Sequence, residues 1–278
     1  MAGSSELSHD QYTIGWICAL PLELATAIAM PDVRIGKHSV VIACLPGGQY
    51  GTTSTTAVPV QSSKADIRLG VVVVSQSSAT HGGVIQYDYG KSLHGGHVQR
   101  TGMLNYPPQA LLTALVRLQA NHRVSGSVIS TYVRDMIQKS PRMQRLLDLS
   151  VTLIVPCPTR ATKEPVIHYG PIASGNQVIK HNFKRDRLGV EFGAYCVEIE
   201  ATGLMNHYPC VLVRGKYDYA DIHKDYKWQG YAAAVASVYA KELLMVTSIS
   251  PNLQSPKSRA AGPASVGPVI IISELQMG

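Results

Sequence analysis

Two groups of acidic residues follow apolar, strand-like runs in the C-terminal half of the chain. Val197-Glu-Ile-Glu-Ala201 holds Glu198 and Glu200, and Arg214-Gly-Lys-Tyr-Asp-Tyr-Ala-Asp221 holds Asp218. The period-two spacing of the two glutamates allows both side chains to point to one side of a strand end. Carboxylates at strand ends can hold a sugar and protonate a leaving group, which cleavage of an N-glycosidic bond requires. For each acidic residue taken alone, a solvated surface position is the alternative.

The segments that must position these residues alternate between strand-like and helix-like patterns. Apolar, β-prone runs predict strands at 12–20, 67–75, 151–156, 167–173, 196–199 and 209–214, and a hairpin at 33–45. Helical spacing predicts helices from Pro21 onward and at 107–121, 185–191, 201–207 and 229–246. Small residues on most faces of the last helix predict close packing against a sheet. Strands that alternate with helices indicate an α/β fold.

The domain organisation follows from length and local composition. The chain has 278 residues and 45% hydrophobic residues, enough for one large domain with a sizeable core. Residues 1–11 are polar and predict a disordered leader, and residues 12–249 form the predicted domain. From residue 250 the composition shifts to Pro, Ser, Gly and Lys, which predicts a linker or disordered tail over 250–278.

Charge and cysteine content exclude several function classes. The net charge is +7, but the basic residues are scattered and form no stripe with interleaved aromatics, which argues against nucleic-acid binding. The five cysteines contain no Cys-x-x-Cys pair, and four lie in apolar runs, which favours reduced thiols and a cytoplasmic location. No apolar run approaches the ~20 residues of a membrane span. The sequence predicts no cofactor and no metal site; a homo-oligomer remains open.

Four segments in order resemble the purine nucleoside phosphorylase and nucleosidase superfamily. They are Tyr12-Thr-Ile-Gly-Trp-Ile-Cys-Ala-Leu-Pro-Leu-Glu23, Gly170-Pro-Ile-Ala-Ser-Gly-Asn-Gln-Val-Ile179, the Glu198 segment and the Asp218 segment. The chain is most similar to the nucleoside-phosphorylase-like N-terminal domains of fungal multidomain receptors of the NACHT and ankyrin type. This resemblance implies a three-layer αβα fold with a central mixed sheet, and a purine nucleoside as the small-molecule partner.

The resemblance also implies a role for each matching position. Asp218 matches the acid that protonates the purine at N7, and Glu200 matches the carboxylate that binds ribose hydroxyls. Glu23 matches the base that activates water, although an acidic residue in a first helical turn is also favoured by the helix dipole alone. The remaining substrate-binding positions are Glu198 and Ile199 at the sugar, and Ser174, Gly175, Asn176 and Val178 at the base.

One part of the family pattern is missing. The family has a helix, a strand and a Gly-rich anion loop where this chain has only the nine residues 56–64, whereas a mean helix and strand need about 17 residues. A second shortening falls between Met30 and Pro31, and Val71 stands where an Asp is expected. We therefore expect residues 41–45 and 67–75 to lose a neighbour in the sheet. Without the loop, whose N–H groups would cradle phosphate, hydrolysis is favoured over phosphorolysis.

Two function classes follow from the sequence. The first is cleavage of the N-glycosidic bond of a purine nucleoside, with Asp218 and Glu23 as the catalytic residues. The second is a non-catalytic, truncated sensor or interaction module derived from such an enzyme. Release of free purine base distinguishes the two.

Overall fold

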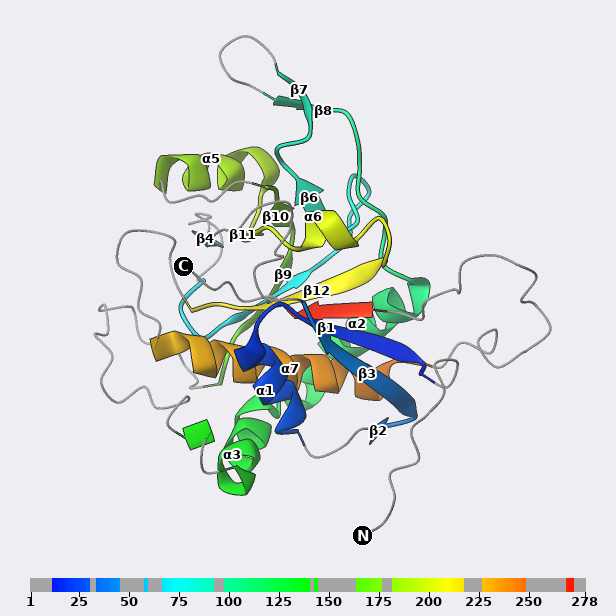
Figure 1. Cartoon of the computed structure of the whole chain (residues 1–278), viewed down its shortest axis with the longest axis vertical. Coiled ribbons are helices and arrows are strands. Elements are labelled where there is room, and N and C mark those ends of the chain that lie inside the picture. Colours follow the sequence, from blue (N-terminus) through cyan, green and yellow to red (C-terminus); the bar gives the residue numbers. More distant parts are fainter. Residues whose placement is uncertain are drawn as a thin grey trace, which may run out of the picture.

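The structure is a computed structural model of the whole chain (Figure 1). It describes residues 12–30, 34–45, 58–59, 67–92, 98–140, 143–144, 164–176, 182–217, 227–248 and 269–272. The predicted strand at 151–156 lies outside these residues.

A seven-stranded mixed sheet forms the centre of the molecule, in the order β2-β3-β1-β13-β12-β5-β9. Its strands are β2 Arg34–Ile35, β3 His38–Cys44, β1 Ile14–Cys18, β13 Val269–Ile272, β12 Cys210–Gly215, β5 Val72–Ser75 and β9 Ile167–Gly170. The strands β3, β1, β13 and β12 run parallel, whereas β2 and β5 are antiparallel to β3 and β12. The carboxyl ends of the four parallel strands therefore share one edge of the sheet. The predicted α/β fold with a central mixed sheet is confirmed.

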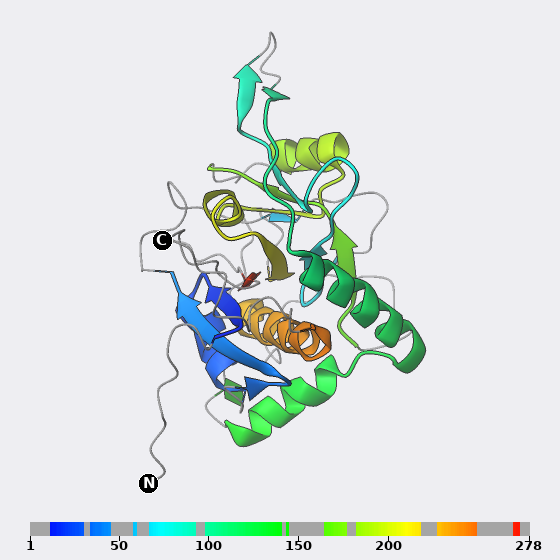
Figure 2. The ribbon, with the colours of Figure 1, turned by 90° about the vertical axis from the view of Figure 1, so that its right-hand side faces the viewer.

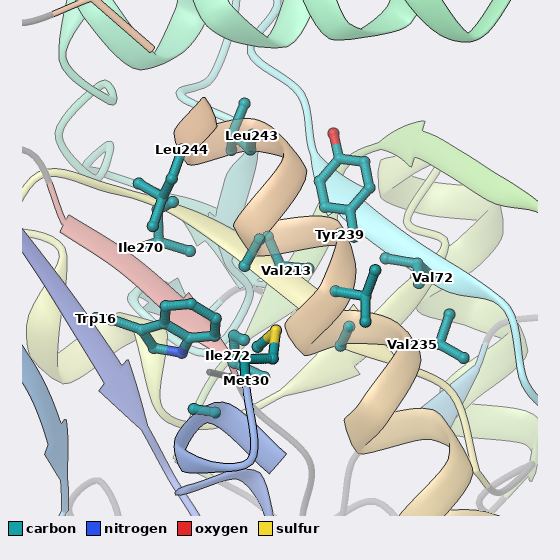
Figure 3. Packing of buried hydrophobic residues seen from close by; sticks show 14 of the residues in the cluster. Trp16, Met30, Val72, Val213, Val235, Tyr239, Leu243, Leu244, Ile270 and Ile272 are labelled. Carbon is teal, nitrogen blue, oxygen red and sulfur yellow. The ribbon is translucent and has the colours of Figure 1, made fainter. Parts of the chain in front are cut away.

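Helices cover one face of this sheet. The helix α7 Lys227–Val246 lies along β12, β13 and β5, and α1 Pro21–Ile28, α2 Gln109–Ser125 and α3 Ile129–Lys139 pack against α7 (Figures 1 and 2). Trp16, Val213, Ile270 and Ile272 of the sheet and Tyr239, Leu243 and Leu244 of α7 belong to one hydrophobic core (Figure 3). Fully buried alanines let α7 approach its neighbours closely: Ala232, Ala233, Ala234, Ala236 and Ala240. The predicted close packing of this helix is confirmed.

A second, four-stranded sheet lies on the other side, in the order β4-β11-β10-β6. Its strands are β4 Val58–Pro59, β11 Cys196–Glu198, β10 Ile172–Ser174 and β6 Val84–Gln86, and the helices α5 Asn182–Phe192 and α6 Ala201–Leu204 accompany it. A second hydrophobic cluster joins the two sheets, with Val73 and Leu212 from the large sheet and Ile172 from the small one. A hairpin of β7 Gly90–Ser92 and β8 Val98–Arg100 projects from this side (Figures 1 and 2).

The strand β13 contradicts the predicted disordered tail or linker over 250–278 at residues 269–272, and the rest of that range lies outside the described residues. Val269–Ile272 lies between β1 and β12, and none of its four residues is more than 2% exposed. The physical reason is the Val-Ile-Ile-Ile run itself, whose β-branched side chains suit a buried strand. The folded domain therefore extends beyond residue 249 and includes 269–272.

The expected loss of a sheet neighbour is wrong for β5, which lies between β12 and β9. In β3, residues 41–44 pair with β1 alone among the described strands, because β2 pairs only with His38 and Ser39. Because β13 stands between β1 and β12, the sheet is continuous across its centre. Residues 46–57 and 60–66, where the shortening falls, lie outside the described residues.

The other predicted elements are largely present. The hairpin at 33–45 is formed by β2 and β3, and its turn contains Gly36 at a φ of 62°. Pro21 occupies the first position of α1, as predicted. The predicted strand at 167–173 is instead two strands, β9 and β10, which belong to different sheets. The helix α3 was not predicted. None of the described helices combines the length and apolarity needed to cross a bilayer.

Candidate functional site

The candidate site forms where β10 and β11 end side by side. The two strands are parallel, and Ser174 is the register partner of Glu198. The N–H of Gly175 donates to the carbonyl oxygen of Glu198 at 3.2 Å. Ser174, Glu198 and Glu200 are all buried. Two segments that the sequence assigned to the base and the sugar are thus in direct contact.

The carboxylate of Glu198 organises the turn from β11 into α6. Its Oε2 accepts the N–H groups of Glu200 and Ala201, each at 2.8 Å. The strand ends at Glu198, and Glu200 is already the N-cap of α6 with helical backbone angles. Strand periodicity therefore does not relate the two glutamates, as the sequence had suggested. Their carboxyl groups are brought close by the strand-to-helix turn.

Burial and a like charge perturb this pair. Burial, then the charge of Glu200 and a hydrogen bond between the two carboxyl groups, raise the pKa of Glu198 to about 8, while hydrogen bonds from Ser174 and Ala201 act in the opposite direction. Within the described residues, Oε1 of Glu198 and Oε1 of Glu200 are buried and have no hydrogen-bond partner. The pair therefore holds, at neutral pH, a proton that an exposed glutamate would have released.

The loop 174–176 is held by hydrogen bonds on both sides. The hydroxyls of Ser174 and Thr202 are hydrogen-bonded, and the N–H of Thr202 donates to Ser174 Oγ at 3.0 Å. The N–H of Asn176 donates to Oδ2 of Asp88. A Cβ on Gly175 would lie 2.6 Å from the Tyr87 ring, so this position needs glycine for the close contact. Val178, expected to line the base, lies outside the described residues.

Glu23 lies at the carboxyl edge of the large sheet, just after β1. It is fully buried, and its Oε2 accepts the N–H groups of Ala19 at 2.6 Å and Leu20 at 3.0 Å. It is the N3 residue of α1, and one of the two N–H groups that it accepts belongs to the N-cap residue, Leu20. The sequence allowed for a first-turn acid favoured by the helix dipole; Glu23 does lie in the first turn, but it is buried and also binds the two N–H groups that precede the helix. Its role as a base that activates water stays a prediction.

The end of β12 and the residue that follows the strand have buried, charged side chains at the same edge of the sheet. Arg214 is 4% exposed and Lys216 5%, and Lys216 Nζ donates to the carbonyl oxygen of Ile67 at 2.9 Å. Burial acts to lower the pKa of Arg214, but the neighbouring Cys196, Glu200 and Glu198 raise it above its ordinary value. Asp218, the predicted acid, follows directly but lies outside the described residues.

The structure thus brings together six of the seven predicted site residues that it describes. The contacting set is Ser174, Gly175, Asn176, Glu198, Ile199 and Glu200. Glu23 belongs to the other sheet, and Asp218 and Val178 are not described. The sequence interpretation missed Thr202, Asp88 and Arg214. Arg214 had a visible signal, because it is a charged residue inside an otherwise apolar strand.

Within the described ranges, these residues lie beside neither a metal-binding cluster nor an ionised thiol. No group of three or more His, Cys, Asp or Glu side chains able to hold a metal ion occurs in the described ranges. Cys18, Cys44, Cys196 and Cys210 are free. Burial raises the pKa of the Cys196 thiol to about 12, so it is protonated at neutral pH and behaves as a small core residue.

Comparison with known proteins relates the chain to two groups. No protein-family model matches the sequence. A nucleotide-binding leucine-rich repeat (NLR)-like protein of the fungus Hyaloscypha variabilis is 38% identical over 307 residues, which covers 90% of this chain but 30% of that protein. The chain therefore spans under a third of this relative. Because the alignment is longer than the 278 residues of the chain, the relative has segments that the chain lacks.

The fold is found in bacterial nucleosidases. Futalosine hydrolase of Helicobacter pylori superposes with a TM-score of 0.50 at 14% identity, covering 85% of this chain and 99% of that one. A Borrelia burgdorferi protein provisionally assigned as a 5′-methylthioadenosine/S-adenosylhomocysteine nucleosidase and bound to adenine gives 0.52 at 14%, covering 83% and 98%. The chain therefore has the fold of the nucleoside phosphorylase and nucleosidase superfamily, and its sequence is similar to part of a fungal NLR-like protein.

Proposed function

We propose that this protein cleaves the N-glycosidic bond of a purine nucleoside by hydrolysis. The observation that carries the proposal is the buried Glu198–Glu200 pair, in which one oxygen of each carboxyl group has no partner among the described residues. A buried polar atom without a partner is unfavourable unless a ligand supplies the hydrogen bond. Sugar hydroxyls both donate and accept, so they match a protonated carboxyl beside a carboxylate.

In the proposed mechanism, residues at the edges of both sheets share the work of binding the nucleoside and breaking its glycosidic bond. Glu200 accepts hydrogen bonds from ribose hydroxyls, and the loop 174–176 contacts the purine. Asp218 donates a proton to N7 of the base as the C1′–N9 bond breaks, and the bond's electron pair leaves with the base. The oxygen of a water molecule bonds to C1′, and Glu23 takes its proton. The products are free purine and ribose.

Water is the proposed acceptor for two reasons. The Gly-rich loop that the family places before residue 65 has no counterpart in residues 56–64, which contain no glycine, whereas a carboxylate is present at Glu23. Glu23 Oε2 accepts the N–H groups of Ala19 and Leu20, which fixes the position of the carboxyl group at the end of β1. Water as the acceptor of the sugar and a purine as the leaving base are both parts of this proposal.

A second candidate is a nucleoside-binding sensor without turnover. It is favoured by the similarity to an NLR-like protein of which this chain corresponds to under a third. In that case the same carboxyl pair would bind a purine nucleoside, but no base would be released.

The test is chromatographic detection of free purine from adenosine, inosine, guanosine and 5′-methylthioadenosine, with and without phosphate. We expect release that does not depend on phosphate. The variant Asp218→Asn should bind nucleoside but lose about 10²–10⁴-fold in turnover, the usual contribution of a general acid. Binding without release by the unchanged protein would support the sensor, and failure to bind any nucleoside would refute both candidates.

A further inference from the structure

We propose that a cavity between α2 and β9 is a second binding site, for a small organic anion with a planar or apolar body. The inference goes beyond the proposed nucleoside chemistry and does not depend on it. The cavity has a volume of about 360 Å³, within the range of about 300–1,000 Å³ that is typical of sites for small molecules. Its described lining residues are Gln119, His122, Arg123, Ser127, Ile167 and Tyr169.

The cavity lies on the face of the large sheet that α7 covers, away from the carboxyl pair of the candidate functional site. Ile167 and Tyr169 of β9 are the register partners of Val72 and Val74 in β5. All four side chains belong to, or pack against, the hydrophobic core on the α7 side. The carboxyl pair instead follows β11 of the small sheet, which lies on the other side of the large sheet. A ligand in the cavity would therefore leave that pair accessible to a nucleoside.

The polar groups of the lining are arranged to donate hydrogen bonds. Nε2 of Gln119 is buried and has no hydrogen-bond partner within the described residues. The hydroxyl of Tyr169 accepts a hydrogen bond from the hydroxyl of Tyr239 at 3.3 Å, so its own hydrogen can be donated to a ligand. Ser127 Oγ likewise accepts the N–H of Ile129 at 3.2 Å and keeps its own hydrogen. A buried donor without an acceptor is unfavourable, so this lining favours a ligand that supplies acceptor atoms.

The charges around the cavity favour an anion. The guanidinium of Arg123 is always charged, and its planar set of donors matches the oxygens of a carboxylate or a phosphate. None of the described lining residues is acidic. Glu242 of α7 is the carboxylate bound to the lining, and its Oε2 already accepts a hydrogen bond from Nε2 of His122 at 3.1 Å. The acceptor atoms of the ligand are therefore expected to carry a negative charge.

Aromatic side chains give the cavity an apolar wall that is fixed to the core. Tyr239, a buried residue of the α7 core (Figure 3), makes edge-on contacts with Tyr169 and with His122, at 6.3 and 6.4 Å between ring centroids. Burial raises the pKa of Tyr169, although the hydrogen bond with Tyr239 acts in the opposite direction, so the hydroxyl is protonated at neutral pH. Ile167 adds an aliphatic surface to the lining. A bare inorganic ion would leave these apolar surfaces without a contact, which favours an organic anion.

The experiment is calorimetry on the full chain with probes that contain no sugar. Phenyl phosphate and benzoate are the anionic probes, and benzamide is the uncharged counterpart of benzoate. We expect an anionic probe to bind and benzamide to bind about tenfold or more weakly than benzoate, because hydrogen bonds to charged groups are the stronger ones. Tighter binding of phenyl phosphate would support the site and identify a phosphate ester as its ligand. Tighter binding of benzoate would support the site and identify a carboxylate.

Matched variants of α2 test the lining residues. Arg123→Gln should weaken binding of the anion about tenfold or more, since it removes the charged donor. Arg117→Gln changes an exposed arginine of the same helix that does not line the cavity, and it should leave the affinity unchanged. Tyr169→Phe keeps the ring and removes the hydroxyl, so it should also weaken binding. Thermal melts of each variant check that it is folded.

Four results would overturn the proposal: no binding of either anionic probe, equal binding of benzamide and benzoate, equal binding of inorganic phosphate and phenyl phosphate, or equal losses in Arg117→Gln and Arg123→Gln. Displacement of the bound anion by saturating inosine would also overturn it, because the anion would then occupy the nucleoside site. Since no probe contains a sugar, a failure of the proposed nucleoside cleavage would leave the expected result unchanged.

Discussion

Ser174 and Glu198 are direct partners in the parallel pairing of β10 and β11, and both are fully buried. Strands parallel to each other end at the same edge of a sheet, so two segments assigned separately to base and sugar meet at one point. A buried acid in such a place titrates far from its usual range, and this gives the site a measurable signature.

The variant Glu198→Gln should remove a pH dependence of stability. The pKa of Glu198 is raised by burial and by Glu200 from 4.5 to about 8, so between these values the folded state holds a proton that the unfolded state has released. Stability of the wild type should therefore fall as pH rises from about 5 to 8. Gln keeps an oxygen for the two N–H groups of the turn but cannot ionise.

The measurement is denaturant unfolding of both proteins at pH 5, 6, 7 and 8. Each unit of pKa shift corresponds to about 1.4 kcal/mol, so the difference between the two curves should be large. A constant difference across this pH range would mean that Glu198 ionises normally.

Gly175→Ala should destabilise the loop 174–176, which is expected to contact the purine base. The new Cβ would lie 2.6 Å from the Tyr87 ring and 3.0 Å from Cγ of Asp88, so the loop or the ring must move. Overpacking of this kind destabilises by about 1–3 kcal/mol. The matched control is Gly203→Ala in α6, where no atom lies within 4 Å of the new Cβ. Thermal unfolding of both variants tests this; equal melting temperatures would contradict the tight contact.

Glu200 should discriminate between sugars. A carboxylate that accepts hydroxyl hydrogen bonds makes charge-assisted contacts, each worth about 1.5–3 kcal/mol. We expect 2′-deoxynucleosides to bind about tenfold or more weakly than ribonucleosides, and Glu200→Gln to reduce that ratio. Calorimetry with paired ribo and deoxy ligands measures it. The hypothesis fails if the wild type binds both sugars equally.

The fold was predictable where local patterns agree with tertiary packing. Pro21 and the apolar run before it correctly placed β1 and α1, because a strand and an N1 proline are both local signals. The helix α3 was missed although Ile129, Val133 and Met136, its buried residues, have the i, i+4, i+7 spacing of an amphipathic helix.

The remaining differences between the expected and the observed structure depend on contacts between segments that are distant in the sequence. Nothing local shows that Val269–Ile272 pairs with β1 and β12, because sheet order is set by tertiary packing. The turn between Glu198 and Glu200 is similar: period-two spacing suggested one strand face, whereas the Glu198 carboxylate binds the N–H groups of Glu200 and Ala201 and starts a helix there. The residue types at the site were predictable, but their geometry was not.

Truncation after Ser250 should unfold the domain. The four residues of β13 are fully buried, and burial of one Val or Ile side chain stabilises by about 1.5–3 kcal/mol. Their sum is comparable to the whole stability of a typical domain, about 5–15 kcal/mol. Circular dichroism and thermal melts test this, with Ile272→Val as the conservative control at about 0.5–1.5 kcal/mol. A truncated chain that melts cooperatively at the original temperature would contradict the central position of β13.

The central claim is hydrolysis at the Glu198–Glu200 site, and isotope tracing tests it most directly. A purine ribonucleoside is incubated with the protein in ¹⁸O-labelled water containing phosphate, and the sugar product is analysed by mass spectrometry. We predict free purine and ribose that carries ¹⁸O, with no ribose 1-phosphate. Unlabelled ribose 1-phosphate, or no cleavage of any purine nucleoside tested, would contradict the account.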